Sequence, residues 1–274
     1  MAVAFGRGLG TRGEPPDPLA VDMLPAPLAM ALRAAQRAPA AARSLLRGLT
    51  LGMVDHVCLR TAAIDAALRD AIDGGCDQLV ILGAGLDARA WRIDALAGAT
   101  VFEVDHPSTQ PGKREAVDAL VPLAARVCFV AVDFERQRVA DRLADEGHDA
   151  SRPTAWIWEG VTPYLHPLAI ATTLEDIGAR SAPGSVLMMT YAIPALVPLP
   201  IPGVRLITRA AFKGLGEELY GAMTSTEAAD AAARIGFDVV SDGDARDWAR
   251  HAEGNATLAR PFRGERLLVA RRRI

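Results

Sequence analysis

The chain has 274 residues, half of them hydrophobic, which is enough apolar material for a large core within one domain. Its formal net charge of −3 gives no basic electrostatic footprint, which argues against nucleic acid or an anionic membrane as a partner. The three cysteines are scattered, which predicts reduced thiols. We find no run of about 18 apolar residues and no apolar signal sequence, so a cytoplasmic protein is expected.

The region before the first predicted strand has a mainly helical composition. Residues 1–18 mix Gly, Arg and Pro, which predicts no regular structure there. Pro25–Leu51 is rich in Ala and Leu, and Pro39 interrupts this helical composition. Val54–Ile72 carries apolar residues at the spacing of an amphipathic helix. Within it, Arg60 could offer a bidentate fork to a carboxylate ligand, although an isolated helix arginine is more often a solvated charge.

The central feature of the sequence is an apolar strand that leads into a Gly-x-Gly turn. Gln78–Leu82 lacks polar alternation, which favours a parallel strand buried on both faces. Gly83 and Gly85, on either side of Ala84, allow a tight turn and a close approach of the backbone to a ligand. Asp87 follows, where a carboxylate repels phosphate but suits a helix start or a cationic ligand. Taken alone, such a turn also occurs in any tight connection from strand to helix.

The next strand ends in an acid at the spacing of a nucleoside site. After a short helix over Ala88–Leu96, Val101–Asp105 is predicted to be the second strand. Asp105 lies 20 residues after the second glycine of the turn, near the separation at which a carboxylate meets ribose hydroxyls. Glu103 projects to the same side and could support the site or the fold. A ligand with a ribose, an ammonium and a sulfonium fits this turn better than a dinucleotide, and S-adenosylmethionine is such a ligand.

The third predicted strand ends in an acid followed by an aromatic residue. A helix over Lys113–Leu123 leads to the strand Arg126–Val132, which ends at Asp133 and Phe134. The carboxylate could accept a hydrogen bond from the exocyclic amine of adenine, and the ring could pack on the base. Asp133 could equally cap the following helix, Arg138–Glu146.

The fourth predicted strand, Thr154–Trp158, ends at Glu159 and Gly160. Ligands of open α/β sheets bind beyond the carboxyl ends of the strands, so Glu159 is expected to face an ammonium or sulfonium, with a helix cap as the alternative. Tyr164 is expected to line a substrate pocket beside this strand end. His166 could act as a base, although a histidine near a helix start is more often a cap or a surface residue.

The C-terminal part continues the alternation of helices and strands. Ile193–Ile207 is apolar but broken by prolines, which predicts a lid-like insertion over residues 193–223, with an ordinary packed connection as the alternative. The alternation predicts an α/β fold with a mostly parallel sheet and helices on both faces. The remaining predicted elements are the helix His166–Ser181, the strand Ser185–Tyr191, the helix Ser225–Ile235 opened by Thr224, and the strands Phe237–Ser241 and Arg266–Arg271.

Several segments carry a resemblance as a set: Arg60-Thr61, Leu82–Arg92, Phe102–Pro107 with Lys113, Asp133-Phe134, and Glu159–Val161 with Tyr164-Leu165. Together they resemble the leucine carboxyl methyltransferase family, and within it a bacterial branch of S-adenosylmethionine-dependent methyltransferases. The resemblance implies a single domain over residues 1–274 with a seven-stranded, Rossmann-like class I methyltransferase sheet whose last strand is antiparallel. It implies that residues 1–53 form a helical cover and that Arg60 binds the methionine carboxylate. It also places Arg12 near a basic position that some relatives use, although the local match is poor.

The resulting hypothesis is an S-adenosylmethionine-dependent O-methyltransferase acting on a carboxylate or hydroxyl of a small molecule, such as a polyketide-type metabolite. Alternatives are a protein or peptide C-terminal carboxyl methyltransferase, an NAD-dependent oxidoreductase and a non-catalytic nucleoside-binding protein. A carboxylate acceptor would need no general base, whereas a hydroxyl would need one. The sequence contains no evident cluster of metal ligands, so metal-independent transfer is expected, and the oligomeric state stays open. The predicted cofactor-binding residues are Arg60, Gly83, Ala84, Gly85, Asp105, His106, Asp133, Phe134, Glu159 and Gly160; the predicted catalytic residues are Tyr164 and His166, with His106 as a further candidate base.

Overall fold

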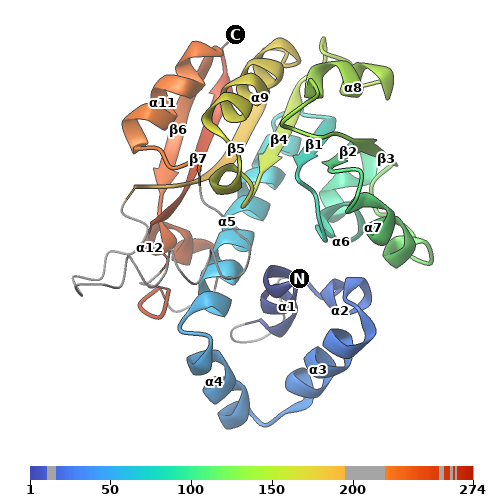
Figure 1. The fold of residues 1–274 in the computed structure, drawn as a ribbon, viewed down its shortest axis with the longest axis vertical. Coiled ribbons are helices and arrows are strands. Elements are labelled where there is room, and N and C mark those ends of the chain that lie inside the picture. Colours follow the sequence, from blue (N-terminus) through green and yellow to red (C-terminus); the bar gives the residue numbers. More distant parts are fainter. Residues whose placement is uncertain (11–16, 195–219, 253–255, 260–261, 263, 274) are drawn as a thin grey trace.

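A seven-stranded sheet forms the centre of the computed structural model, which describes residues 1–10, 17–194, 220–252, 256–259, 262 and 264–273. The strand order is β3-β2-β1-β4-β5-β7-β6 (Figure 1). β7 runs antiparallel to both of its neighbours, and the other pairs are parallel. This topology confirms the predicted sheet and its antiparallel last strand. The strands are β1 (Gln78–Leu82), β2 (Thr100–Asp105), β3 (Arg126–Ala131), β4 (Thr154–Trp158), β5 (Val186–Ala192), β6 (Phe237–Gly243) and β7 (Glu265–Arg272).

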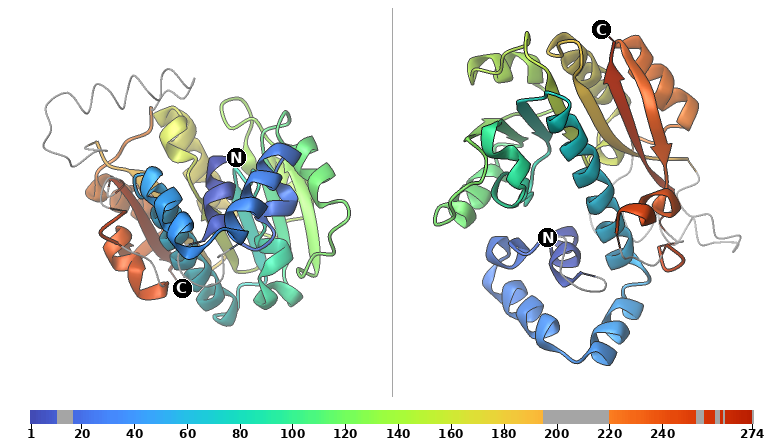
Figure 2. Two further views of the ribbon diagram at one scale, coloured as in Figure 1. Left: turned by 90° about the horizontal axis from the view of Figure 1, so that it is seen from below. Right: turned by 180° about the vertical axis from the view of Figure 1, so that it is seen from behind.

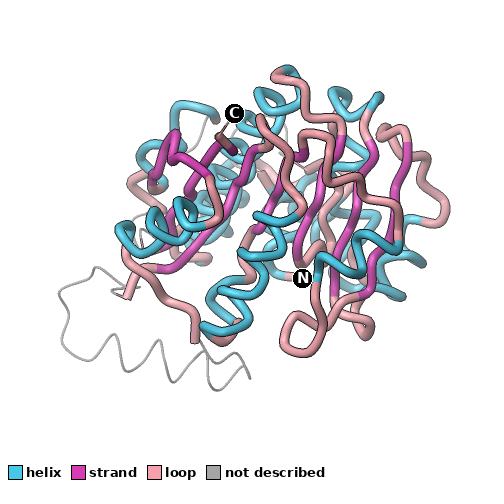
Figure 3. Tube along the Cα trace, turned by 90° about the horizontal axis from the view of Figure 1, so that it is seen from above, coloured by secondary structure: helices cyan, strands magenta, loops and turns pink. Residues whose placement is uncertain are grey.

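Helices lie on both sides of the layer of strands (Figure 3). One face is covered by α5 (Met53–Asp73), α6 (Arg89–Arg92), α7 (Gln110–Val117) and α12 (Ala245–Trp248), which share an apolar core with the sheet. The other face is covered by α8 (Val139–Asp145), α9 (Pro167–Ala179) and α11 (Ser225–Arg234). Within the described residues, short 3-10 helices also connect these elements: η1 (Asp94–Gly98), η2 (Thr162–Tyr164) and η3 (Ala249–His251).

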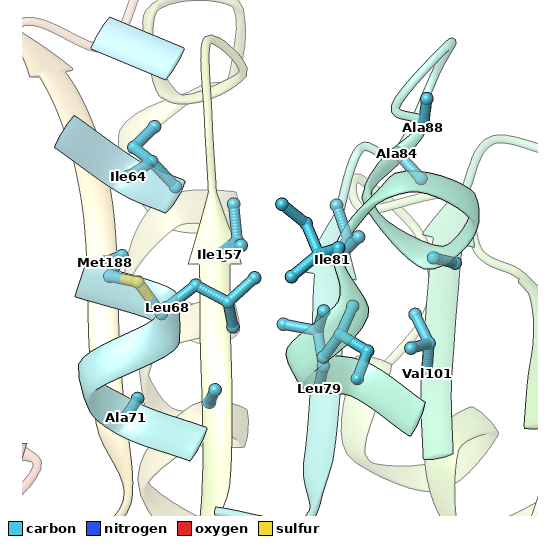
Figure 4. Packing of buried hydrophobic residues seen from close by; sticks show 14 of the residues in the cluster. Ile64, Leu68, Ala71, Leu79, Ile81, Ala84, Ala88, Val101, Ile157 and Met188 are labelled. Carbon is cyan, nitrogen blue, oxygen red and sulfur yellow. The ribbon is translucent and has the colours of Figure 1, made fainter. Parts of the chain in front are cut away.

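The two cores follow from the alternation of side chains along each buried strand. In β1, Leu79 and Ile81 face α5, while Val80 and Leu82 belong to the core on the opposite face. Figure 4 shows the first of these cores, where Ile64 and Leu68 of α5 pack toward the strands. All five residues of β1 are buried, as the lack of polar alternation predicted.

Four helices before α5 form an N-terminal cover: α1 (Ala2–Leu9), α2 (Ala20–Met23), α3 (Ala26–Arg37) and α4 (Ala40–Leu49). α3 and α4 extend away from the sheet (Figure 1, Figure 2). The break between them falls at Ala38 and Pro39, as the composition predicted. None of the described helices is long and apolar enough to cross a membrane.

The expectation that residues 1–18 lack regular structure is wrong, because Ala2–Leu9 is a helix. Its glycines act as contact points. A Cβ added to Gly8 would lie 2.6 Å from the Leu32 side chain, and one added to Gly6 would lie 3.8 Å from Val57. Tertiary packing therefore outweighs the low helix propensity of glycine.

Two further predicted boundaries are wrong. The helix predicted over Lys113–Leu123 is α7, which begins three residues earlier and ends at Val117, with Pro111 in its first turn, where proline is tolerated. The helix predicted over Ala88–Leu96 is divided into α6 and the 3-10 helix η1. Most of the predicted insertion, residues 195–219, lies outside the described residues, as does Arg12. Thr224 opens α11 with a reciprocal capping box, as predicted.

Candidate cofactor site at the carboxyl ends of the central strands

The glycine turn after β1 adopts a backbone that requires glycine. Gly83 has a φ of +68° and Gly85 a φ of +46°, both in the left-handed region. A side chain at Gly83 would also overlap the Val161 side chain in the connection after β4. The amides of Gly83 and Ala84 donate to the Val104 carbonyl at 2.7 and 3.0 Å, which ties the turn to β2.

Asp105, at the end of β2, contacts this turn directly. Its Oδ2 accepts a hydrogen bond from the Gly85 amide at 2.6 Å, and its Oδ1 accepts one from the His106 amide at 2.7 Å. The structure therefore brings together the glycine and the acid that the sequence paired by spacing. The carboxylate lies at the edge of the turn and is partly exposed.

A cavity of about 200 Å³ lies beside the turn. Its walls come from the glycine turn itself, from Arg60 of α5, and from Glu159, Gly160 and Val161 after β4. Met1 and three residues of α1, Val3, Ala4 and Arg7, also line this cavity. A larger cavity of about 420 Å³ lies between α5, α12 and β7, but it contains none of the predicted site residues.

Glu159 is held between two guanidinium groups. Its Oε1 accepts from Arg60 Nε at 2.9 Å, and its Oε2 accepts from Arg89 NH1 at 2.9 Å. Burial by itself raises the pKa of Glu159, but the charges of Arg60 and Arg89 outweigh burial and hold this pKa well below its ordinary value. Glu159 is therefore ionised, and its charge is shared with two cations.

The other edge of Arg60 is bound by Glu265, the first residue of β7. Arg60 NH1 donates to both oxygens of Glu265, at 2.7 and 2.8 Å. His56 Nε2 lies 2.5 Å from Glu265 Oε2. Burial by itself raises the pKa of Glu265. Arg60 and then His56 outweigh burial and lower this pKa to about 2.

Arg89 extends the network to the turn and to α5. It pairs with Asp87 and donates from Nε to Asp65 at 2.7 Å, and Asp65 also pairs with Arg92 at 2.6 Å. The Arg89 amide donates to Asp87 Oδ1 at 2.8 Å, so Asp87 supports the start of α6, as predicted for a helix start. Burial raises the pKa of Asp87, but Arg89 and other nearby cations outweigh it and lower this pKa overall.

Glu103 lies in the interior of the fold and not in the cavity wall. Its Oε2 is 2.6 Å from Lys113 Nζ, which also donates to the Asp87 carbonyl at 2.6 Å. Burial raises the pKa of Glu103 to about 7 despite the nearby lysine. Of the two roles that the sequence left open for Glu103, these contacts favour the structural one.

The predicted adenine-binding pair lies at the end of β3. Asp133 Oδ1 accepts from the Glu135 amide at 3.0 Å, and its Oδ2 lies 3.8 Å from His106 Nε2. Phe134 is half-buried and packs against the core of that face. The residue at the cap of α8 is Arg138, so Asp133 is not the cap of the following helix.

The predicted catalytic residues lie farther along, around η2 and α9. Tyr164 is 41% exposed, and His166 precedes α9 at the cap position without a capping bond from its side chain. The His166 ring packs 4.2 Å from the Tyr220 ring. Neither Tyr164 nor His166 belongs to the described lining of the 200 Å³ cavity.

Six residues of the network were not predicted from the sequence to have a role: Arg7, His56, Asp65, Arg89, Arg92 and Glu265. Arg7 donates to the Leu86 carbonyl at 2.6 Å and pairs with the buried Asp17 at 3.2 Å, which attaches α1 to the glycine turn. Of these, Arg89 and Arg92 belong to the segment Leu82–Arg92 that carries the family resemblance.

Residues 1–178 match the family model for leucine carboxyl methyltransferase. The chain belongs to the leucine carboxyl methyltransferase family. Among curated family relatives, one from Mycobacterium marinum is 47% identical over 135 residues, and one from Mycobacteroides abscessus is 40% identical over 187 residues. Both carry the provisional name of an S-adenosyl-L-methionine-dependent methyltransferase. The aligned parts cover 48% and 68% of this chain, but only 43% and 61% of those relatives.

Solved structures support the same fold for this family member. A protein from Thermobifida fusca, titled provisionally as a methyltransferase, superposes with a TM-score of 0.63 over 87% of this chain and 91% of that chain. The two sequences are 19% identical, so this likeness concerns the fold. The described residues contain no group of three or more His, Cys, Asp or Glu side chains placed to hold a metal ion.

Proposed function

We propose that this family member transfers a methyl group from S-adenosylmethionine to an oxygen of a small-molecule acceptor, such as the carboxylate or hydroxyl of a polyketide-type metabolite. The observation that carries the proposal is the cavity in which the glycine turn, Arg60 and Glu159 meet beneath the N-terminal cover. Family membership supports the cofactor and the class of reaction.

Arg60 and Glu159 line the cavity, whereas Asp105, His106, Asp133 and Phe134 follow the neighbouring strands and lie outside its described lining. Together they suit each part of this cofactor. Asp105 would accept hydrogen bonds from the ribose, and Asp133 with Phe134 would hold the adenine, next to His106. Arg60 would bind the methionine carboxylate, while Glu159 would face the ammonium or the sulfonium. The turn carries a buried carboxylate at Asp87 instead of a phosphate site, which disfavours the NAD-dependent alternative.

The charge of the network also fits. Three guanidiniums (Arg60, Arg89 and Arg92) are linked by ion pairs to four carboxylates (Asp65, Asp87, Glu159 and Glu265). These seven side chains together carry one more negative than positive charge. The cofactor has one carboxylate, one ammonium and one sulfonium, so its excess is positive, and the two excesses are complementary.

The chain would contribute mainly positioning and the exclusion of water. When bound, the cofactor supplies a methyl group that its sulfonium has already activated. Arg60, Asp105 and the glycine turn would fix its orientation, and α1 would shield the cavity from solvent. A carboxylate acceptor needs no general base, so its methylation would require neither Tyr164 nor His166.

The test is transfer of a labelled methyl group from S-adenosylmethionine into a panel of polyketide-type carboxylic acids, phenols and peptides with a free carboxyl terminus. We expect labelled esters from the small carboxylic acids. Asp105→Ala should remove the activity, whereas Asp94→Ala, a change at an exposed acid, should retain it. Labelling of peptides alone would favour the C-terminal carboxyl methyltransferase. Absence of cofactor binding, or tight binding of NADH instead, would contradict the proposal.

A further inference from the structure

The guanidinium of Arg60 is fixed along two of its edges by two different carboxylates. Nε and NH2 point to Glu159 Oε1, each at 2.9 Å, and NH1 points to both oxygens of Glu265. The Arg60 side chain is only 6% exposed. A planar guanidinium bound in this way cannot rotate about its last bond without breaking one of the two ion pairs.

The cavity side of Arg60 is left open by a glycine. Gly160 has a φ of +68°, and a Cβ placed there would lie 3.8 Å from both NH1 and NH2 of Arg60. Since Arg60 and Gly160 both line the cavity, a carboxylate inside it would reach the guanidinium past Gly160. This approach depends on the orientation that Glu159 and Glu265 impose on the fork.

Glu265 is itself fixed by the sheet and by a neighbouring histidine. It pairs with Ala192 of β5 in the antiparallel ladder, so its backbone belongs to the sheet. Its Oε2 contacts His56, whose ring packs near those of Trp248 and Phe262, with ring centroids 5.5 and 5.0 Å away. A carboxylate anchored by the sheet and by a packed histidine can set the direction of its arginine partner.

We propose that Glu265 is a positioning residue that acts through Arg60: it orients the guanidinium toward Gly160 so that the cavity can bind the methionine carboxylate of the cofactor. The inference rests on the proposed role of Arg60. It assigns to the start of β7 a part in cofactor recognition, although Glu265 does not line the cavity.

Two ligands separate this role from a general contribution to stability. S-adenosylhomocysteine carries the amino-acid carboxylate, whereas 5′-methylthioadenosine has the same nucleoside and thioether without it. By isothermal titration, we expect Glu265→Gln to weaken S-adenosylhomocysteine about tenfold, as for the loss of support for one charge-assisted contact. The affinity for 5′-methylthioadenosine should stay within about twofold, since no contact to the carboxylate is involved.

Glu265→Asp, which keeps the charge on a shorter side chain, should restore part of the affinity for S-adenosylhomocysteine, and it provides the same comparison should Glu265→Gln fail to fold. Glu175→Gln, at an exposed acid on α9, is the matched control and should leave both ligands unaffected. If Glu265→Gln lowers the affinity for both ligands equally, the role of Glu265 is merely structural. If its affinity for S-adenosylhomocysteine is unchanged or higher, Glu265 does not position Arg60. Either result overturns the inference.

Arg60→Ala separates this inference from the proposal beneath it. If Arg60→Ala weakens S-adenosylhomocysteine selectively and Glu265→Gln does not, only the role of Glu265 is refuted. If Arg60→Ala leaves S-adenosylhomocysteine unchanged, the carboxylate assignment of Arg60 fails and the positioning role fails with it.

Discussion

Replacing Arg89 with methionine should be among the most destabilising single changes in the described part of the chain. The Arg89 side chain has no exposed surface, and it pairs with Asp65, Asp87 and Glu159, whose side chains are 14%, 6% and 8% exposed. Removing one partner of a buried ion pair costs about 3–5 kcal/mol, because the remaining charge stays buried without compensation. Domain stabilities are about 5–15 kcal/mol, so Arg89→Met should remove a large share of the free energy of unfolding.

The effect should also depend on pH with a defined sign. Burial alone would raise the pKa of Asp87 and of Glu159, and the guanidinium charges reverse this. Without Arg89 these two pKa values rise, so the folded variant binds protons more readily than the folded wild type does. The destabilisation caused by Arg89→Met should therefore shrink as the pH falls from about 7 to about 4.

Urea unfolding followed by tryptophan fluorescence, at both ends of this pH range, measures the effect. Arg69→Met is the matched control, because Arg69 is 44% exposed and its partner Asp94 is 84% exposed. The control should change the free energy of unfolding by less than about 1 kcal/mol. A comparably small loss for Arg89→Met at neutral pH, or a loss that is the same at both pH values, would refute the electrostatic reasoning.

Three further predictions follow from the same geometry. Gly83→Ala should lower the free energy of unfolding by about 1–3 kcal/mol through backbone strain. Gly98→Ala should not, because a Cβ at Gly98 would have no atom within 4 Å. Chemical denaturation of the two variants measures the difference. The pKa of Glu265 is lowered from 4.5 to about 2 in the folded state, so its contribution to the free energy of unfolding is fully present above about pH 4.5 and is lost as the pH falls through about 2. Acid unfolding of the wild type and of Glu265→Gln tests this. For a carboxylate acceptor, Tyr164→Phe and His166→Ala should each lower kcat by less than about tenfold; a fall of about 10²–10⁴ would indicate a general base.

The strands were predictable because their signal is local. Gln78–Leu82 and Thr154–Trp158 have the predicted bounds, since an unbroken apolar run of that length in an α/β chain is typical of a buried parallel strand. The N-terminal helix Ala2–Leu9 was not predictable in this way. Its glycines lower helix propensity, and their use as contact points for Leu32 and Val57 appears only once distant helices are packed.

In the candidate site, too, local signals were predictable from the sequence and contacts between distant segments were not. The proximity of Gly85 and Asp105 follows from the turn and from the parallel pairing of β1 with β2. The spacing of 20 residues led to Asp105 as a predicted ribose ligand, whereas its hydrogen bond from the Gly85 amide was not predicted. The contact of Arg60 with Glu265 joins residues 205 positions apart, and no local pattern marks either residue as the partner of the other. Buried ion pairs between distant segments are thus the part of the site that required the structure.

This network also bears on turnover under the proposed function. Its ion pairs are mostly buried, so they are screened little by salt. Methyl transfer converts the sulfonium of the cofactor into a neutral thioether and thereby removes one positive charge from the ligand. The excess carboxylate of the network, which complements the charge of the cofactor, then has no counterpart in the product. Under the proposed function, the electrostatic part of binding would therefore favour the cofactor over its demethylated product, which is the direction needed for product release and renewed loading.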